Sequence, residues 1–228
     1  MELAALYIYA YLVGSIPTAY IIGRLVRGID IREHGSGNVG GSNLYYNVGG
    51  RWVFPLGVVE LFIKGGSPIW IGMWWLDKDT SSFALMGAAL IAIAGNNWSC
   101  YLRFTGGRGV AVTSGALLAL AFWQLLLFIG IAIGGWALFR SSGVWVLISL
   151  ALLPLWSYLL GAPLAVISFC FGLVALTSLK RLTGNWEPLP DGVPKGQVFF
   201  NRLFRDRDFA SRDQWMGRMP SQGNEGIG

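Results

Sequence analysis

Long runs of apolar residues, separated by short polar segments, dominate the chain from its start to about residue 179. The runs cover roughly residues 3–26, 52–76, 82–96, 110–139, 143–160 and 162–179. Because about 20 apolar residues are needed to cross the hydrocarbon core of a bilayer, these runs predict membrane-spanning helices. The pattern therefore predicts an all-α polytopic membrane protein.

The run 110–139 decides how many helices the pattern predicts. It is too long for one span without strong tilt, and a tight turn at Gln124 would divide it into two short spans. The arginine-bearing loops and the C-terminal tail then share one side of the membrane, and only Lys78 lies on the other, as the positive-inside rule favours. A single helix would lose most of this bias. We therefore expect about seven transmembrane helices, with the N-terminus outside and the C-terminus cytoplasmic.

Composition agrees with this class of protein. Charged residues make up 13% of the 228 residues and the mean hydropathy is +0.54, whereas soluble domains carry about 25% charged residues. The N-terminus lacks the basic region and cleavage site of a secretory signal, so the first span is expected to stay. We expect a helical transmembrane domain over residues 1–184 and a cytoplasmic tail over 185–228. The tail either lies on the membrane as an amphipathic segment or is an extension without catalytic duty, which we favour.

Two polar loops stand out against the apolar background. The stretch "HGSGNVGGSN" (34–43) lies in the loop 27–50, and "NNWSCYLRFTGGRG" forms the loop 96–109. The glycines of "GSGNVG" match the dinucleotide-binding pattern, but that pattern has meaning only between a strand and a helix of a βαβ unit. Here a membrane helix precedes it, so nucleotide binding is rejected. Both loops are expected on the cytoplasmic face.

The composition of these loops suits phosphate groups. Glycines let consecutive backbone N–H groups form concave anion sites, and a helix N-terminus adds further unpaired N–H groups. The backbone candidates are Gly37, Gly40, Gly106, Gly107 and Gly109, the hydrogen-bonding side chains are Ser36, Asn38, Ser42 and Asn43, and the cationic clamps are Arg103 and Arg108. The alternative is that the glycines serve helix packing, the amides cap their own loop and the arginines follow from membrane topology.

Charged residues near or within the spans form a second set of candidates. Glu60 and Lys64 lie four residues apart inside the second span, where charged groups are expensive and are usually paired or functional. Lys64 therefore either pairs with Glu60 or binds substrate. Lys180 and Arg181 end the last span, where snorkelling to the membrane surface is the default interpretation. Cys100 and Cys170 belong to no metal-binding pattern, and no metal or other cofactor is expected.

The first loop resembles a motif of the bacterial acyl-phosphate-dependent glycerol-3-phosphate acyltransferases, the PlsY family. The family motif runs roughly G-S-G-N-x-G-A-T-N, and this chain has Gly35, Ser36, Gly37, Asn38, Gly40, Ser42 and Asn43. A second motif is similar to Phe104, Gly106, Gly107, Arg108, Gly109, Val110 and Ala111. Lys64–Gly65 and "LKRLTG" (179–184) resemble two further family features, and the likeness extends over about residues 7–187.

The resemblance implies acyl transfer from acyl-phosphate to the 1-hydroxyl of glycerol 3-phosphate, giving lysophosphatidic acid and phosphate in phospholipid biosynthesis. It implies catalytic roles for Ser36, Asn38 and Arg108. It implies substrate or phosphate binding by Gly37, Gly40, Ser42, Asn43, Lys64, Arg103, Gly106, Gly107 and Gly109. The expected partners are both substrates, membrane lipid and an acyl-phosphate-producing enzyme, but no nucleic acid. The expected location is the bacterial inner membrane, with the active site facing the cytoplasm.

The chain departs from the family pattern at several positions. The family has arginine, histidine, lysine, an acidic residue, histidine and asparagine where this chain has, in order, Tyr46, Asn96, Arg108, Leu61, Ala175 and Ser178. Because an acyl-phosphate is already activated, these changes should affect binding and positioning more than chemistry. Two alternatives remain open: a paralogue with another acyl acceptor or donor, and a non-enzymatic transporter or scaffold.

Overall fold

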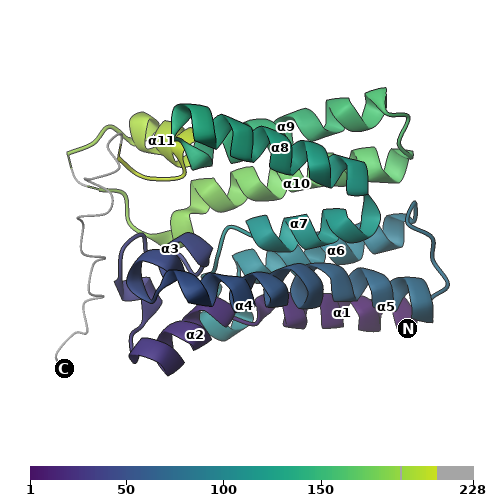
Figure 1. Ribbon diagram of the computed structural model, residues 1–228, viewed down its shortest axis with the longest axis horizontal. Coiled ribbons are helices and arrows are strands. Elements are labelled where there is room, and N and C mark those ends of the chain that lie inside the picture. The colour runs from purple at the N-terminus through teal and green to yellow at the C-terminus, as the bar shows by residue number, and fades with distance from the viewer. Residues whose placement is uncertain (191, 210–228) are drawn as a thin grey trace.

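The computed structural model describes residues 1–190 and 192–209, and this part of the chain is a bundle of helices without a β-strand (Figure 1). The helices are α1 (Glu2–Ser15), α2 (Thr18–Arg27), α3 (Gly41–Asn47), α4 (Val53–Val58), α5 (Ser67–Trp75), α6 (Phe83–Asn97), α7 (Val110–Leu120), α8 (Phe122–Phe139), α9 (Ser142–Leu159), α10 (Leu164–Thr183) and α11 (Lys195–Arg205). A π-helical segment, Val59–Gly66, joins α4 to α5 in one continuous rod.

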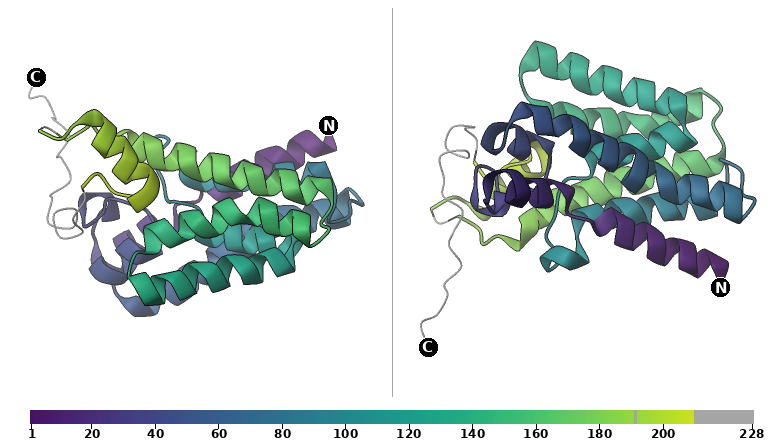
Figure 2. Two further views of the ribbon diagram at one scale, coloured as in Figure 1. Left: turned by 90° about the horizontal axis from the view of Figure 1, so that it is seen from above. Right: turned by 60° about the horizontal axis from the view of Figure 1, so that its bottom comes forward.

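Seven apolar helical stretches run along the long axis of the bundle. Five are long and apolar enough to cross a membrane, and α6 and α7 are the two shorter apolar helices among the described residues. Figure 2 shows α8, α9 and α10 side by side, and α10 also packs on α6, which joins them to α1, α5 and α7. The predicted all-α membrane fold is thereby confirmed. The number of crossings and the side of each terminus stay predictions.

The first span is one apolar stretch with a break at its centre. α1 ends at Ser15 and α2 begins at Thr18, and Pro17 between them has non-helical dihedral angles. Proline has no backbone N–H to donate and its ring hinders the preceding turn. The break therefore opens the helix where Ser15 and Ile16 face the interior of the bundle.

The run 110–139 forms two helices, as predicted, but the turn does not lie at Gln124. The chain reverses at Ala121, whose φ of −154° and ψ of 71° leave the helical region. Gln124 is buried in the first turn of α8. A polar residue suits this position because the first-turn N–H groups lack helical partners. The glutamine thus marks the beginning of the second helix, and the predicted turn was three residues too late.

Glycines allow two pairs of helices to pack in close contact. A Cβ atom on Gly14 of α1 would lie 2.1 Å from the carbonyl oxygen of Ala92 in α6. A Cβ atom on Gly115 of α7 would lie 2.0 Å from the carbonyl oxygen of Leu61 in the π-helical segment. Small residues at such crossings are typical of membrane helix packing. The second contact fixes the rod that carries Lys64 against α7.

The C-terminal segment is docked on the bundle rather than separate from it. Arg181, at the end of α10, is buried and donates to the carbonyl oxygens of Leu203 and Gly143, both at 2.8 Å. Arg202 of α11 is also buried and pairs with Asp208 at 2.6 Å. The described part of the segment after residue 184 therefore lies in contact with the bundle, while the division into a domain and a tail stays a prediction. The snorkelling interpretation of Arg181 was wrong, because its guanidinium points into the protein. Residues 210–228 of the expected tail lie outside the described residues.

Candidate functional site at one end of the bundle

The two glycine-rich loops meet at one end of the bundle, where the last membrane helix also ends. Asn185 follows α10, and its Nδ2 donates to Asn38 Oδ1 at 3.3 Å and to the Gly106 carbonyl oxygen at 3.2 Å. The amide N–H of Gly106 donates back to Asn185 Oδ1 at 3.1 Å. One asparagine side chain thus ties loop one to loop two, although the three residues are far apart in the sequence.

Asn43 shapes loop one from within. Its Nδ2 donates to the carbonyl oxygens of Ile31, His34 and Asn38 at 2.8, 3.0 and 3.0 Å, and its side chain is buried. Its Oδ1 accepts a hydrogen bond from Asn47 at 2.7 Å. Every polar atom of this amide is therefore used inside the loop. The expectation of a direct substrate contact is corrected, since the structure favours the capping alternative.

An ion-pair cluster supports the beginning of loop one. The buried carboxylate of Asp30 receives two hydrogen bonds from the Arg32 guanidinium, at 2.7 and 3.0 Å, and one from Arg24 at 3.3 Å. Burial raises the pKa of Asp30, but the hydrogen bonds and charge of Arg32 outweigh it, with help from Arg24, and the pKa lies below its usual value. The carboxylate stays ionised and holds the start of the loop in place.

Loop one keeps two of its predicted polar residues close to the junction. Ser36 Oγ accepts from the Asn38 backbone N–H at 3.4 Å, and Gly37 has a φ of 69°, a conformation that glycine adopts readily. Ser42 is exposed at the start of α3, a few residues beyond. The backbone around Gly40 is open, since a Cβ atom there would meet nothing within 4 Å.

Loop two lies against both loop one and the end of α6. A Cβ atom on Gly107 would lie 2.6 Å from the Val39 carbonyl oxygen, and one on Gly106 would lie 2.3 Å from that of Asn96. Gly109, with a φ of 70°, precedes the first residue of α7. Only glycine permits these approaches. The prediction that glycines serve backbone shape here agrees with the geometry.

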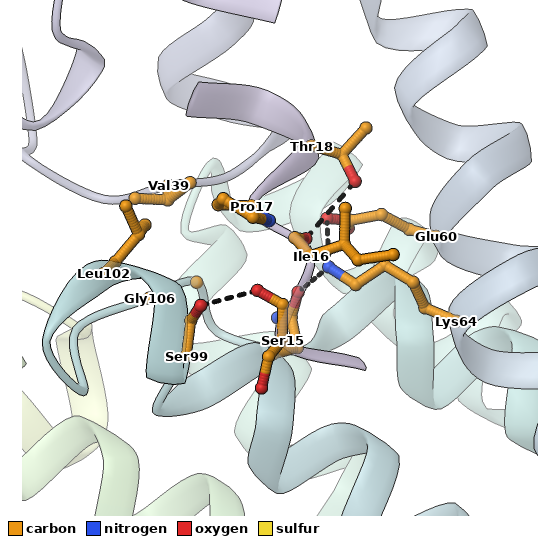
Figure 3. A pocket seen from close by; sticks show the side chains of 12 residues that line it. Ser15, Ile16, Pro17, Thr18, Val39, Glu60, Lys64, Ser99, Leu102 and Gly106 are labelled. Carbon is orange, nitrogen blue, oxygen red and sulfur yellow. Dashed lines mark hydrogen bonds and ion pairs between the residues drawn. The ribbon is translucent and has the colours of Figure 1, made fainter. Parts of the chain in front are cut away.

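A narrow cavity opens beside the junction (Figure 3). It is lined by the break between α1 and α2, by Val39, Gly106 and Gly107 of the loops, and by Glu60 and Lys64. Lys64 Nζ donates to Asn96 Oδ1 at 2.5 Å and lies 3.5 Å from Glu60 Oε1. Both charged side chains are buried, with Lys64 1% exposed. The Glu60–Lys64 pair that the spacing predicts is therefore present, and it faces the cavity.

Two further cations approach the junction from other elements. Lys180 is fully buried, and its Nζ donates to the Asn97 carbonyl oxygen and to Asn185 Oδ1 at 2.6 Å. Arg108 Nη1 donates to the Lys180 carbonyl oxygen at 3.3 Å, and its Nε lies 2.8 Å from Asp206 Oδ1. Lys180 therefore points into the bundle, contrary to the snorkelling expected from its place at a helix end.

Arg103 does not join this group. It is exposed, in a left-handed conformation, and lines a separate open hollow with Tyr20, Arg32 and Tyr101. The residues that sequence reasoning missed are Asn185 and Asp206, together with the inward orientation of Lys180. The similarity of "LKRLTG" to a family motif was the available signal for Lys180. Nothing in the local sequence distinguishes Asn185 from an ordinary helix-end asparagine.

The assembled groups suit anionic oxygen atoms. Lys64, Lys180 and Arg108 supply positive charge, and the glycine-rich turns supply backbone N–H groups next to them. Among the described residues there is no cluster of histidine, cysteine or acidic residues that could hold a metal ion. These groups lie at one end of a bundle of apolar helices, and they define the class: a multi-pass membrane protein with a cationic site at one end of its helical bundle.

Comparison with known proteins identifies the family within this class. The family model described as glycerol-3-phosphate acyltransferase matches residues 4–188. The chain belongs to the glycerol-3-phosphate acyltransferase family. This membership confirms the resemblance drawn from the loop motifs and, with it, the expectation of a membrane-bound acyltransferase.

Relatives extend the likeness over nearly the whole chain. A glycerol-3-phosphate acyltransferase of Dehalococcoides mccartyi (strain CBDB1) is 34% identical over 96% of this chain and 94% of its own length. One from Moorella thermoacetica is 38% identical over 79% of this chain and 93% of its own. Crystal structures of the integral membrane enzyme PlsY, in glycerol 3-phosphate and lysophosphatidic acid forms, are similar with TM-scores of 0.73 and 0.71. They are 26% and 25% identical and cover 79% of this chain and 88% of PlsY.

Proposed function

We propose that the protein transfers a fatty acyl group from an acyl-phosphate to the 1-hydroxyl of glycerol 3-phosphate. Family membership supports acylation of glycerol 3-phosphate, and the PlsY structures in two liganded forms support the same acceptor. The observation that carries the proposal is the Asn185 bridge between Asn38 and Gly106. It brings two glycine-rich turns to one point, as two phosphorylated substrates require.

The reaction needs no nucleophilic side chain. The 1-hydroxyl oxygen attacks the carbonyl carbon of the mixed anhydride, a new carbon–oxygen ester bond forms, and the bond to phosphate breaks. The hydroxyl proton passes to a phosphate oxygen or to Glu60, which lines the cavity. Lys64, Lys180 and Arg108 stabilise the negative charge of the substrates and of the departing phosphate. The backbone turns orient the two reactants, which accounts for much of the rate of such transfers.

Arg108→Ala and Asn38→Ala are expected to abolish product formation. The arginine supplies a charge-assisted contact and the asparagine shapes the junction, so each change should cost about a hundredfold or more. Purified protein would be given glycerol 3-phosphate and an acyl-phosphate, and the amounts of lysophosphatidate and phosphate that form would be measured and compared. Equal amounts of both products from the wild type are expected. Folded wild-type protein that yields neither product, or that works only with a thioester donor, would contradict the proposal.

The site is proposed to face the cytoplasm of a bacterial inner membrane, where an acyl-phosphate-producing enzyme would supply the donor. The connection from α5 to α6 and the helix α11 lie at opposite ends of the bundle (Figure 1). The positive-inside rule favours a cytoplasmic position for the end that carries the arginines. The N-terminus, at the same end as the α5–α6 connection, would then lie outside.

This orientation makes a direct prediction for two exposed lysines. In a background with Cys100→Ser, Lys78→Cys should react with a membrane-impermeant maleimide in spheroplasts, and Lys195→Cys should react only after lysis. Both side chains are exposed, so accessibility differs only by side of the membrane. The opposite labelling pattern would reverse the topology, and labelling of both before lysis would exclude a sealed crossing between them.

A further inference from the structure

A carboxylate at the end of α11 lies beside the site, although the match to the family model ends at residue 188. Asp206 follows α11 directly, and its Oδ1 lies 2.8 Å from Arg108 Nε. Both side chains are largely buried, with 16% of Arg108 and 21% of Asp206 exposed. Water screens such a pair less than a surface pair. The contact therefore connects a helix outside the common family core to the guanidinium proposed to bind phosphate.

The helix α11 is fixed firmly enough to position another group. Arg181 donates from α10 to the carbonyl oxygen of Leu203, and Arg202 donates from α11 to those of Leu182 and Glu187. A Cβ atom on Gly143 would lie 2.7 Å from the Arg205 carbonyl oxygen, so α11 also lies closely against the start of α9. These contacts, to α9, to α10 and to Glu187, hold α11 as a fixed support for Asp206 and do not suit an inhibitory segment that must leave the site.

Three positively charged side chains surround Asp206. Arg108 contacts the Lys180 carbonyl oxygen, and Arg181 is the next residue along α10. Arg108 and Asp206 both interact electrostatically with Lys180 and with Arg181. Three cations this close repel one another, and one carboxylate among them offsets that repulsion. Among the described residues no contact engages Nη2 of Arg108, so the guanidinium keeps one amino group for an anion.

We infer that Asp206 is a positioning residue for Arg108: its ion pair at Nε holds the guanidinium in place and leaves Nη2 available for a substrate phosphate. The inference rests on the proposed function. If Asp206 positions Arg108, acyl transfer depends on a residue beyond position 188, where the match to the family model ends. The segment that carries α11 is then needed for activity. Asp206 itself touches no reacting atom and acts only through Arg108.

The test compares Asp206→Asn with two related variants. Asp206→Asn keeps the size of the side chain and removes its charge, and kcat/KM for acyl transfer should fall about tenfold, the effect expected from losing one largely buried ion pair at the site. Asp206→Glu should recover most of the loss. Asp208→Asn is the matched control, because it removes a carboxylate two residues away that pairs with Arg202 instead of Arg108. It should lower thermal stability, because it breaks a buried ion pair, and it should leave kcat/KM within about twofold of the wild type.

A double-mutant cycle separates positioning from general stability. In an Arg108→Lys background, which lacks the planar guanidinium, Asp206→Asn should change kcat/KM by less than about twofold. An undiminished tenfold loss in that background, or equal losses in Asp206→Asn and Asp208→Asn, would overturn the inference. Higher activity of Asp206→Asn would overturn it in favour of an inhibitory contact. An inactive wild type would instead refute the proposed function. The contact could still be tested without activity, because an arginine-specific reagent should modify Arg108 faster in Asp206→Asn than in the wild type.

Discussion

Replacing Lys180 by methionine is expected to lower the rate of acyl transfer by at least about a hundredfold, the range found when one charge-stabilising donor is removed from a site. The Lys180 ammonium group holds the Asn97 carbonyl oxygen and Asn185 Oδ1, and it lies 5.4 Å from the centre of the Trp98 ring. Without it, the oxygen atom of Asn185 loses one of its two donors and the bridge to Asn38 and Gly106 is weakened.

The measurement is the initial rate with both substrates at saturation, in protein that elutes as a single species. Lys195→Met is the matched control, since it removes the same charge from an exposed position on α11. The control should retain the wild-type rate. A Lys180→Met protein with a rate within about threefold of the wild type would be incompatible with a role for this ammonium group in the site, given the expected magnitude.

Of the glycines discussed above, Gly115 is the one at which an added methyl group is expected to destabilise the fold most. The new Cβ atom would lie 2.0 Å from the Leu61 carbonyl oxygen and 2.7 Å from the Leu61 carbonyl carbon. Backbone atoms in a packed helix cannot move aside as a flexible side chain can, so α7 must separate from the π-helical segment. A loss of about 3 kcal/mol or more is expected, the upper range for overpacking.

Thermal unfolding in detergent, followed by loss of the monodisperse protein, measures this effect. Gly130→Ala in α8 is the control, because a Cβ atom there would meet nothing within 4 Å. The control should unfold at the wild-type temperature. Because Lys64 lies on the displaced segment, any Gly115→Ala protein that folds should also have lost activity. Equal midpoints for the two alanine variants would show that the helices are not in contact at Gly115.

The pattern of apolar residues predicted the fold well because a bilayer restricts the chain to a few kinds of structure. Backbone groups in lipid must be paired within each helix, so an apolar run of sufficient length becomes a helix almost regardless of its neighbours. The length of the run and the positive-inside rule also predicted that residues 110–139 form two helices. The turn was misplaced because Gln124 was interpreted as a loop residue, whereas a helix start also accommodates a polar side chain, and the dihedral change fell on Ala121.

The site was only partly predictable, for a different reason. The composition of the loops indicated phosphate chemistry, but it could not show which amides face a ligand and which face their own backbone, as Asn43 does. Lys180 and Arg181 are adjacent at a helix end, where both burial and exposure are common. Their direction depends on oxygen atoms supplied by α6, by Asn185 and by α11. Such contacts between distant segments leave no local signal.

The shortness of α6 and α7 determines the depth at which loop two lies. At about 1.5 Å per residue, the 15 residues of α6 and 11 of α7 extend roughly 22 and 17 Å, whereas the hydrocarbon layer is about 30 Å thick. In Figure 1 both helices stop well inside the end of the bundle that carries α2 and α3. When the bundle spans a bilayer, the turn at Gly106–Gly107 is therefore expected to lie below the headgroups. At that depth the proposed acyl-phosphate would reach the turn with its phosphate while its acyl chain stayed in the hydrocarbon layer.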